Sequence, residues 1–521
     1  MAIPSNSVFI AFLLCLPSVS WGANRGTPDS WIPARWQGGP LELARRAQWG
    51  GPPGLPSDAA VRDAIEHWYD VATLHLLDGS PVNCLLVTWS AGADAELERR
   101  QQHLVKAYAA EAHRRDIAVL GLVYPGSDPS NAVAAALDAE LDGLVPDGEF
   151  PDVAQFAGKL EQAFASAHGA AVVIPIFRDA ARGRTANRTV LAVEGVSPGA
   201  RNLADMGIRS GPSSEPWIDS NIWLVRSFRL GPNWRPVWID RQPEGGSPAD
   251  YARCVADAAV AGGRWIVALD DALRAKLRGN DAAAVGVWRR VGAFLGFAEA
   301  HAGWLKFASY GNLALILDTA AADPDTQEEY LKLVARRQIP YRLIVRSQMG
   351  AASLAGFRAV LATELAPPSE AERSVLRAFA ERGGLVIAGP SWGDPPKDDP
   401  YAETLLGKGR VAVYKDPDPE SVARDLRDLL STEDRGVIAF NALAVIAYAS
   451  AGDAGKPLLI QLLNYSGSPA EAITIRVAGL FKTARWYMPE VEPVTLALKQ
   501  EEGKTDVSIP KLPLWGALLL E

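Results

Sequence analysis

The sequence predicts an α/β protein in three parts: a (β/α)8 TIM barrel, a doubly wound α/β domain and a small C-terminal β-sandwich. Short apolar runs alternate with helical segments over residues 30–305, and the alternation restarts over 306–432. Residues 433–521 instead alternate apolar and polar side chains. Strands separated by helices form parallel sheets, and eight such units match a TIM barrel. Period-two alternation is typical of antiparallel strands.

Eight apolar runs are predicted to form the barrel strands. They are 32–36, 84–89, 118–124, 141–146, 172–177, 189–193, 237–239 and 265–269. Helical patterns lie between them at 93–115, 153–168 and 249–261, and the last ends at a Gly262-Gly263 C-cap. Residues 221–230 fit a strand or a helix, and we assign a helix because a strand would be the ninth. The segment between the fifth and sixth strands is short, so we expect a degenerate fifth helix.

The two later parts contain fewer predicted elements. The doubly wound domain has predicted strands at 312–317, 342–345, 359–362 and 385–388, with helices at 325–337 and 369–382. The sandwich has predicted strands at 458–463, 474–477, 484–487 and 514–520. No GxGxxG motif follows a strand, so a dinucleotide site is not supported.

The N-terminus is predicted to be a signal peptide over residues 1–22. The apolar run 8–16 is too short to cross a bilayer, and small residues follow it up to Gly22. We therefore expect an exported bacterial protein, periplasmic or extracellular, with no membrane association after cleavage. Two cysteines would remain, Cys84 in a strand and Cys254 in a helix, and we expect both to be free and buried.

Charge and motifs exclude several classes of function. The chain has 52 Lys and Arg against 61 Asp and Glu, a net charge of −9, and no basic block, which disfavours nucleic acid. Its six His lie in or beside predicted helices without metal-ligand spacing. No GxSxG elbow is present. We therefore expect neither a metal nor a cofactor. Sixteen Trp suggest sugar stacking, although Trp is also ordinary core.

Acidic residues follow four predicted barrel strands, at the end where TIM barrels place their active sites. Two facing carboxylates can divide glycosidic cleavage between protonating the leaving oxygen and attacking the sugar or activating water. The candidate catalytic residues are Asp147, Glu149, Glu194 and Asp240. Asp147 and Glu149 are two positions apart, so in an extended chain their side chains are expected to point to the same side. An acidic residue after a strand can instead cap a helix or form an ion pair, and this alternative applies to Asp240, Asp270 and Asp271.

Aromatic and polar residues at the same rim are predicted to bind a carbohydrate. Rings could stack on a pyranose, while amides and charged groups could bind hydroxyls. The candidates are Trp36, Trp89, Tyr124, Arg178, Trp217, Asn221, Asp270 and Asp271. The alternative for Trp36 and Trp89 is that they close the barrel core.

The order of the three parts resembles the family-42 β-galactosidases and related barrel glycoside hydrolases. The matching runs are 368–379 and 383–390 (GGLVIAGP), together with the closing WGALLLE of 515–521. In that family the middle domain has an amidotransferase fold without its activity and serves in trimer formation, so the resemblance implies a homotrimer here.

The resemblance also implies roles for particular residues. The family carries an Asn-Glu acid/base pair after strand four and a nucleophilic Glu after strand seven. This chain has Asp147-Gly148-Glu149 at the first place and only Asp240 at the second. Glu149 could take the acid/base role. Glu194 on strand six competes with Asp240 as nucleophile, because α-galactosidase-like barrels place their pair on strands four and six.

Three hypotheses for function follow. The first is an exported glycoside hydrolase that uses Asp147 or Glu149 together with Glu194. The second is a non-catalytic carbohydrate-binding protein on a degenerate barrel, which the missing strand-seven Glu favours. The third is a polysaccharide lyase that uses Tyr124 and Arg178 near a uronate.

Overall fold

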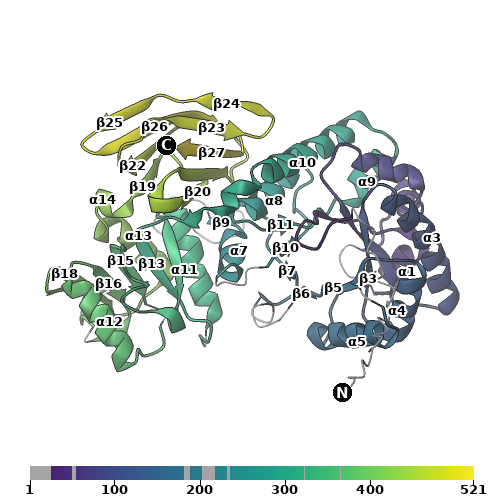
Figure 1. Ribbon diagram of the computed structural model, residues 1–521, viewed down its shortest axis with the longest axis horizontal. Helices are drawn as coiled ribbons and strands as arrows, with labels where there is room; N and C mark the ends of the chain where they lie inside the picture. The colour runs from purple at the N-terminus through teal and green to yellow at the C-terminus, as the bar shows by residue number, and fades with distance from the viewer. Residues whose placement is uncertain are drawn as a thin grey trace, which may run out of the picture.

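The computed structural model describes residues 25–49, 54–169, 171–180, 183, 188–201, 217–230, 235–321, 323–363, 365–393 and 395–521. The predicted signal peptide lies outside these residues. The described chain forms three parts, which Figure 1 shows as a purple-to-teal barrel, a green α/β layer and a yellow sandwich.

The first part is a closed barrel of parallel strands. Its strands are β1 (Pro33–Arg35), β2 (Cys84–Ser90), β3 (Ala118–Val123), β4 (Gly143–Pro146), β5 (Val172–Val173), β6 (Ile176–Phe177), β7 (Leu191–Glu194), β10 (Val237–Asp240) and β11 (Arg264–Trp265). They form the runs β1-β2-β3-β4-β5 and β11-β10-β7-β6. Val267 closes the ring, because its N–H donates to Pro33 and its carbonyl accepts from Arg35.

The fifth barrel strand is interrupted. The sequence predicts one strand over 172–177, but β5 pairs with β4 and β6 pairs with β7. Pro175 lies between β5 and β6 and has no N–H to donate to a ladder. Counting β5 and β6 as one interrupted strand, the barrel has the eight strands that the sequence predicts.

Helices surround the barrel (Figure 1). They are α1 (Gly39–Trp49), α2 (Ala59–Glu66), α3 (Ala95–His113), α4 (Pro129–Asp138), α5 (Val153–Ser166), α7 (Ile222–Phe228), α8 (Pro248–Val260), α9 (Asp271–Arg278) and α10 (Ala282–Ala300), with the short 3-10 helices η1 (Val71–Leu77) and η3 (Ala302–Lys306). Asp94, Asp128 and Asp152 each accept a backbone N–H as N-caps. The helix predicted over 221–230 is confirmed as α7. Most of the segment predicted to hold the degenerate fifth helix lies outside the described residues.

A short antiparallel hairpin follows the sixth barrel strand and was not predicted. It pairs β8 (Gly199–Arg201) with β9 (Trp217–Asp219). An ion pair between Arg201 and Asp219 joins its two strands. Trp217 and Asp219 therefore lie on a strand.

Large aromatic residues fill the space between barrel and helices. The Trp36 ring lies 5.0 Å from the Trp68 ring and 6.3 Å from the Trp288 ring. Cys84 and Cys254 are buried and free, as predicted. The barrel thus buries its apolar surface against the helical layer.

The second part is a doubly wound sheet, as predicted. Its parallel strands are β13 (Leu313–Leu317), β14 (Tyr341–Val345), β15 (Ala359–Ala362), β16 (Leu385–Ala388) and β18 (Gly409–Tyr414), with β17 (Tyr401–Leu406) antiparallel at the edge. The order β14-β13-β15-β16-β18 is that of flavodoxin-like sheets. Its helices are α11 (Pro324–Arg336), α12 (Glu370–Glu381), α13 (Pro419–Leu429) and α14 (Thr432–Arg435). The β17–β18 hairpin was not predicted.

The third part consists of two antiparallel sheets. One has the order β12-β20-β21-β27-β23-β24 and the other β19-β22-β26-β25. The strands are β12 (Ala308–Ser309), β19 (Val437–Phe440), β20 (Val445–Ala451), β21 (Leu458–Asn464), β22 (Ala470–Ala478), β23 (Ala484–Met488), β24 (Val491–Thr495), β25 (Leu498–Glu501), β26 (Lys504–Leu512) and β27 (Trp515–Leu520). An apolar core fills the space between the sheets.

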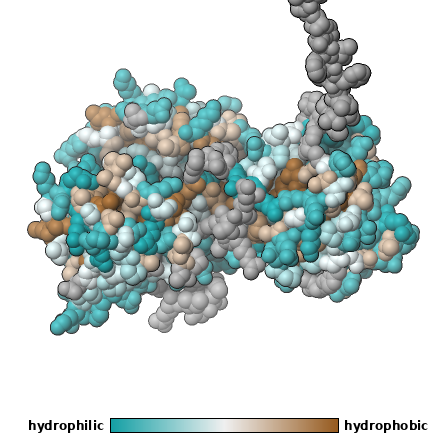
Figure 2. Space-filling view, turned by 60° about the horizontal axis from the view of Figure 1, so that its bottom comes forward, coloured by the Kyte–Doolittle hydropathy of each residue, from teal (hydrophilic) through white to brown (hydrophobic). Residues whose placement is uncertain are grey.

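The sandwich packs directly on the barrel helices. The Tyr465 hydroxyl donates to Asp257 of α8 at 2.6 Å, and the Gln461 amide donates to the Val260 carbonyl at 3.1 Å. The Trp515 ring lies 4.8 Å from the Phe297 ring of α10. Hydrophilic residues cover most of the face in Figure 2, with hydrophobic residues in small patches between them. No helix among the described residues is both long and apolar enough to cross a membrane.

Candidate active site

Charged side chains from five barrel strands gather at the carboxyl-terminal end of the barrel. Asp147 follows β4, Arg178 follows β6, and Arg35, Glu194 and Asp240 end β1, β7 and β10. Glu194 and Asp240 are register partners on neighbouring parallel strands. Three of the four predicted catalytic carboxylates, Asp147, Glu194 and Asp240, therefore lie together. We call these three residues, with Arg35 and Arg178, the mouth cluster.

Arg35 joins two of these carboxylates. Its Nε and Nη2 donate to the two oxygens of Asp240 at 2.7 and 2.6 Å, and its Nη1 donates to Asp147 at 2.7 Å. The Asp147 and Asp240 side chains are almost fully buried. This planar, bidentate geometry is the strong form of an arginine–carboxylate pair. Asp147 and Asp240 are thus held in place beneath the mouth.

Arg178 joins all three carboxylates. Its Nη2 lies 2.5 Å from Asp147, and its Nη1 lies 3.3 Å from Glu194 Oε2 and 3.5 Å from Asp240 Oδ2. Because these last two oxygens share one nitrogen, they are at most about 7 Å apart. Glycosidase carboxyl groups are about 5 Å apart in retaining enzymes and about 6.5–9.5 Å apart in inverting ones. The upper bound of about 7 Å therefore allows the spacing of a retaining pair.

Glu194 is the most accessible carboxylate of the cluster. Its side chain is 31 % exposed, against 5 % for Asp147 and 6 % for Asp240. Arg241 donates to its other oxygen at 3.1 Å. Glu194 thus lies between two arginines, Arg178 and Arg241, and also faces solvent. Of the three clustered carboxylates it is the one best placed to meet a substrate.

The electrostatics of the cluster keep Asp147 ionised. Burial by itself would raise the pKa of the Asp147 carboxyl. The charges of Arg35 and Arg178 outweigh that effect and lower its pKa to about 2. Asp147 cannot serve as a proton donor near neutral pH.

Asp147 is buried and Glu149 is exposed, so Glu149 does not join the ion pairs that hold Asp147. Gly148 adopts a positive φ of 117°, so the chain turns after β4 instead of continuing as a strand. Glu149 is exposed, and no described residue forms a hydrogen bond or ion pair with it.

Trp36 and Trp89 do not wall the mouth, contrary to the prediction that they bind sugar. Both rings are essentially inaccessible. The Trp36 indole donates to the Tyr108 hydroxyl at 2.6 Å, and the Trp89 indole donates to the Ala132 carbonyl of α4 at 3.0 Å. These contacts place both rings between the strands and the helical layer. The alternative interpretation, that Trp36 and Trp89 are core residues, therefore applies.

Tyr124 and Asn221 are also structural. The Tyr124 ring is 3 % exposed, and its hydroxyl accepts from Gln37 at 2.7 Å. The Asn221 side chain accepts from the Val196 N–H and donates to Asp257, both at 2.8 Å. These bonds occupy the polar atoms that the prediction assigned to a sugar.

Asp270 and Asp271 follow the capping and ion-pair alternative. Asp270 is the N-cap of α9 and accepts from Leu273 N–H at 2.8 Å. Asp271 pairs with Arg46 at 2.6 Å. Trp217 remains half-exposed and donates to Asp219. Of the predicted binding residues, Arg178 joins the mouth cluster and Trp217 keeps an accessible ring.

The sequence prediction missed the arginines Arg35 and Arg241. Arg35 ends an otherwise buried apolar strand, and Arg241 directly follows Asp240. A charged residue at the last position of a buried strand is a signal that could have located Arg35. Arg35 pairs with Asp147 and Asp240, and Arg241 pairs with Glu194, so both arginines offset the negative charge of the site.

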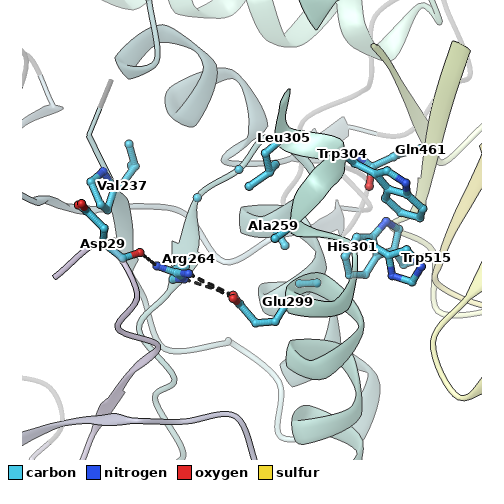
Figure 3. Close-up of a pocket in the computed structure, with 15 residues that line it drawn as sticks. Asp29, Val237, Ala259, Arg264, Glu299, His301, Trp304, Leu305, Gln461 and Trp515 are labelled. Carbon is cyan, nitrogen blue, oxygen red and sulfur yellow. Dashed lines mark hydrogen bonds and ion pairs between the residues drawn. The ribbon is translucent and has the colours of Figure 1, made fainter. Parts of the chain in front are cut away.

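A separate small cavity lies at the other end of the barrel, beside the starts of β10 and β11 (Figure 3). In Figure 3 Arg264 reaches Asp29 and Glu299, while Trp304 and Trp515 lie on the opposite side. Its volume of about 80 Å³ is well below the 300–1,000 Å³ of ligand pockets. Nowhere in the described chain do three or more His, Cys, Asp or Glu group as metal ligands would.

Solved structures show the same fold. The α-L-fucosidase isoenzyme 2 from Paenibacillus thiaminolyticus matches with a TM-score of 0.56 and 12 % identity, over 86 % of this chain and 95 % of that one. The chain therefore shares its fold with this enzyme. The resemblance noted in the sequence is confirmed at the level of architecture.

Two further matches have lower scores. The exo-β-1,4-mannosidase from Opitutaceae bacterium strain TAV5 has a TM-score of 0.44 and 11 % identity, over 78 % of this chain and 96 % of that one. A β-galactosidase from Bacillus circulans sp. alkalophilus has a TM-score of 0.37 and 9 % identity, over 82 % and 68 %. No family model and no curated protein sequence matches the chain.

Proposed function

We propose that the protein is an exported glycoside hydrolase that binds its sugar over the mouth cluster. The observation that carries the proposal is the position of Glu194, a solvent-facing carboxylate at a barrel strand end between Arg178 and Arg241. Its two oxygens form ion pairs with these arginines, and a carboxylate in this place can attack an anomeric carbon or stabilise an oxocarbenium ion. The shared fold adds the architecture in which this chemistry is found.

Glu149 takes the role of proton donor in this proposal. It is exposed after β4, and no described residue forms a hydrogen bond or ion pair with it. The carboxyl of Glu149 would give its proton to the leaving oxygen as the glycosidic bond breaks. Glu194 would form the new bond to the anomeric carbon, and water activated by Glu149 would then release the sugar.

Asp147 and Asp240 act as positioning residues. Both are buried and paired with Arg35. They fix Arg178, and through it Glu194, at the mouth. The substrate touches neither carboxylate in this arrangement.

The experiment is a panel of 4-nitrophenyl glycosides, beginning with α-L-fucoside, β-galactoside and β-mannoside. Glu194→Gln and Glu149→Gln should each lower kcat at least about a hundredfold on the substrate that is turned over. Glu299→Gln, which removes an exposed carboxylate at the opposite end of the barrel, should leave kcat unchanged. Full activity in both site variants would reject the assignment.

A second candidate is a carbohydrate-binding protein without turnover. The observation that favours it is the pairing of the buried Asp147 and Asp240 with Arg35, which leaves Glu194 as the most accessible of the three clustered carboxylates. It predicts sugar binding by calorimetry with no product release from any glycoside. Binding that Arg178→Gln abolishes, without activity in the wild type, would establish it.

A further inference from the structure

A second, larger cavity lies where the barrel, the α/β domain and the sandwich meet. Its volume is about 370 Å³, within the range of small-molecule sites. It shares Trp304, Leu305 and Gln461 with the small cavity of Figure 3. Leu305 and Ala308 on its edge are exposed, so the cavity reaches solvent. We call it the junction cavity.

Three arginines line the junction cavity, and they come from two of the three parts. Arg226 and Arg229 belong to or follow α7 of the barrel, and Arg342 lies on β14 of the α/β domain. None of the described lining residues is Asp or Glu. Arginine stays protonated in proteins, so the cavity wall carries a concentrated positive charge.

Arg226 and Arg342 are held rigidly by aromatic rings. The Arg226 guanidinium lies 4.0 Å from the Tyr341 ring centre and 5.1 Å from that of Tyr448, and it donates to the Tyr341 carbonyl at 2.5 Å. The Arg342 guanidinium lies 3.7 Å from the Phe357 ring centre. Stacked guanidinium groups lose little further freedom when they bind a ligand.

Arg342 has N–H donors without a described acceptor. Arg342 donates through Nε to the Gly311 carbonyl at 2.9 Å, and no described residue accepts from its two terminal amino groups. No described carboxylate pairs with Arg226 or Arg342. Burial lowers the pKa of the Arg342 and Arg229 guanidinium groups, which shows that their charge is partly desolvated. An anion would offset that desolvation.

The remaining wall suits a small hydroxylated molecule. Ser309 and Ser450 supply hydroxyl groups, and Gln461 supplies its amide oxygen, since its amide nitrogen bonds to Val260. The Tyr448 hydroxyl lies 3.1 Å from Ser309 Oγ. The Phe307, Trp304 and Tyr448 rings supply apolar faces. Rings beside hydroxyls and amides are the mixture that binds a sugar ring.

We propose that the junction cavity binds an oxyanion-bearing small molecule, a sugar that carries a phosphate or a carboxylate. Arg226 and Arg342 receive the oxyanion, and the hydroxyl and amide groups bind the sugar. The site lies apart from the mouth cluster and does not depend on the function proposed there. Because residues of all three parts line it, bound ligand stabilises their packing.

The experiment is isothermal titration of the full chain with potassium phosphate, glucuronate and neutral glucose, at constant ionic strength in a chloride buffer. We expect phosphate or glucuronate to bind and glucose not to bind. Tighter binding of phosphate would identify a phosphate-bearing ligand, and tighter binding of glucuronate a sugar acid. Arg342→Gln should weaken Kd about tenfold, as expected for loss of a hydrogen bond between charged groups.

Two further variants complete the test. Arg377→Gln removes an exposed arginine of α12 that does not line the cavity, and it should leave Kd unchanged. Arg226→Lys is the substitute test if Arg342→Gln fails to fold. It keeps the charge but loses the planar guanidinium, so it should weaken binding. Absence of binding by both anions, or binding that neither cavity variant changes, would overturn the proposal.

Discussion

Arg35 holds Asp240 through two parallel hydrogen bonds, from Nε at 2.7 Å and from Nη2 at 2.6 Å. The two residues end the first and seventh strands of the barrel and are 205 positions apart in the chain. The pair is part of the mouth cluster, and the remaining terminal nitrogen of Arg35, Nη1, donates to Asp147. The accessible chemistry at this end of the barrel is thereby left to Glu194 and Glu149.

Arg35→Gln should destabilise the fold strongly. It leaves two buried carboxylates without their main counterion, a change that typically costs about 3–5 kcal/mol. Urea denaturation followed by circular dichroism measures the loss. Arg99→Gln, which breaks the exposed pair with Glu96, should change the free energy of unfolding by less than about 1 kcal/mol. Equal effects of the two variants would mean that the Arg35 pairs contribute nothing beyond a surface pair.

Stability should fall as the pH drops from about 5 towards 2. Arg45 and Arg46 outweigh the effect of burial and lower the pKa of Glu42 to about 2, as Arg35 and Arg178 do for Asp147. In the unfolded chain these groups titrate near 4. The unfolded state therefore takes up protons first as the pH falls, and the stabilisation present at neutral pH is lost.

Denaturation at pH 6, 4 and 3 tests this pH dependence. Glu42→Gln should flatten it, since Gln carries no proton to take up. Glu149→Gln should leave it unchanged, because no described residue pairs with Glu149. A slope identical in the wild type and Glu42→Gln would refute the assignment.

Trp89→Ala should lower stability without changing affinity for a sugar. The Trp89 ring is fully buried between β2 and α4, and such truncations cost about 3–5 kcal/mol. Trp217→Ala removes a half-exposed ring and should cost less. Calorimetric titration with the sugar identified in the glycoside panel measures affinity. A large loss of affinity in Trp89→Ala, at a temperature where the variant is folded, would mean that the Trp89 ring contributes to sugar binding.

The strand pattern predicts the barrel because apolar runs and helical segments alternate locally. It also places Glu194 and Asp240 at strand ends, since parallel strands end on one edge. The direction of the Trp89 ring could not be predicted, because barrel strands are apolar on both faces and carry no alternation. The Arg35–Asp240 pair could not be predicted either, because it depends on closure of the ring through Val267. The positive φ of Gly148 also escaped prediction, because alternation assumes a regular strand through residues 147–149.

Tyr465→Phe should weaken the attachment of the sandwich to the barrel. The Tyr465 hydroxyl lies 2.6 Å from Asp257 and 3.0 Å from Ser220, all of them buried, and its removal leaves the Asp257 carboxylate with one donor fewer. Loss of such a buried bond costs about 1–3 kcal/mol. Differential scanning calorimetry should show a lower Tm.

Tyr487→Phe is the matched control for this change. Tyr487 lies on β23 of the same sandwich, and its ring contacts His301 and Trp304 of the barrel part, but no described residue bonds to its hydroxyl. Its loss should change stability by less than about 0.5 kcal/mol. If both variants lower Tm equally, the bond between Tyr465 and Asp257 contributes no more than a hydroxyl without a partner.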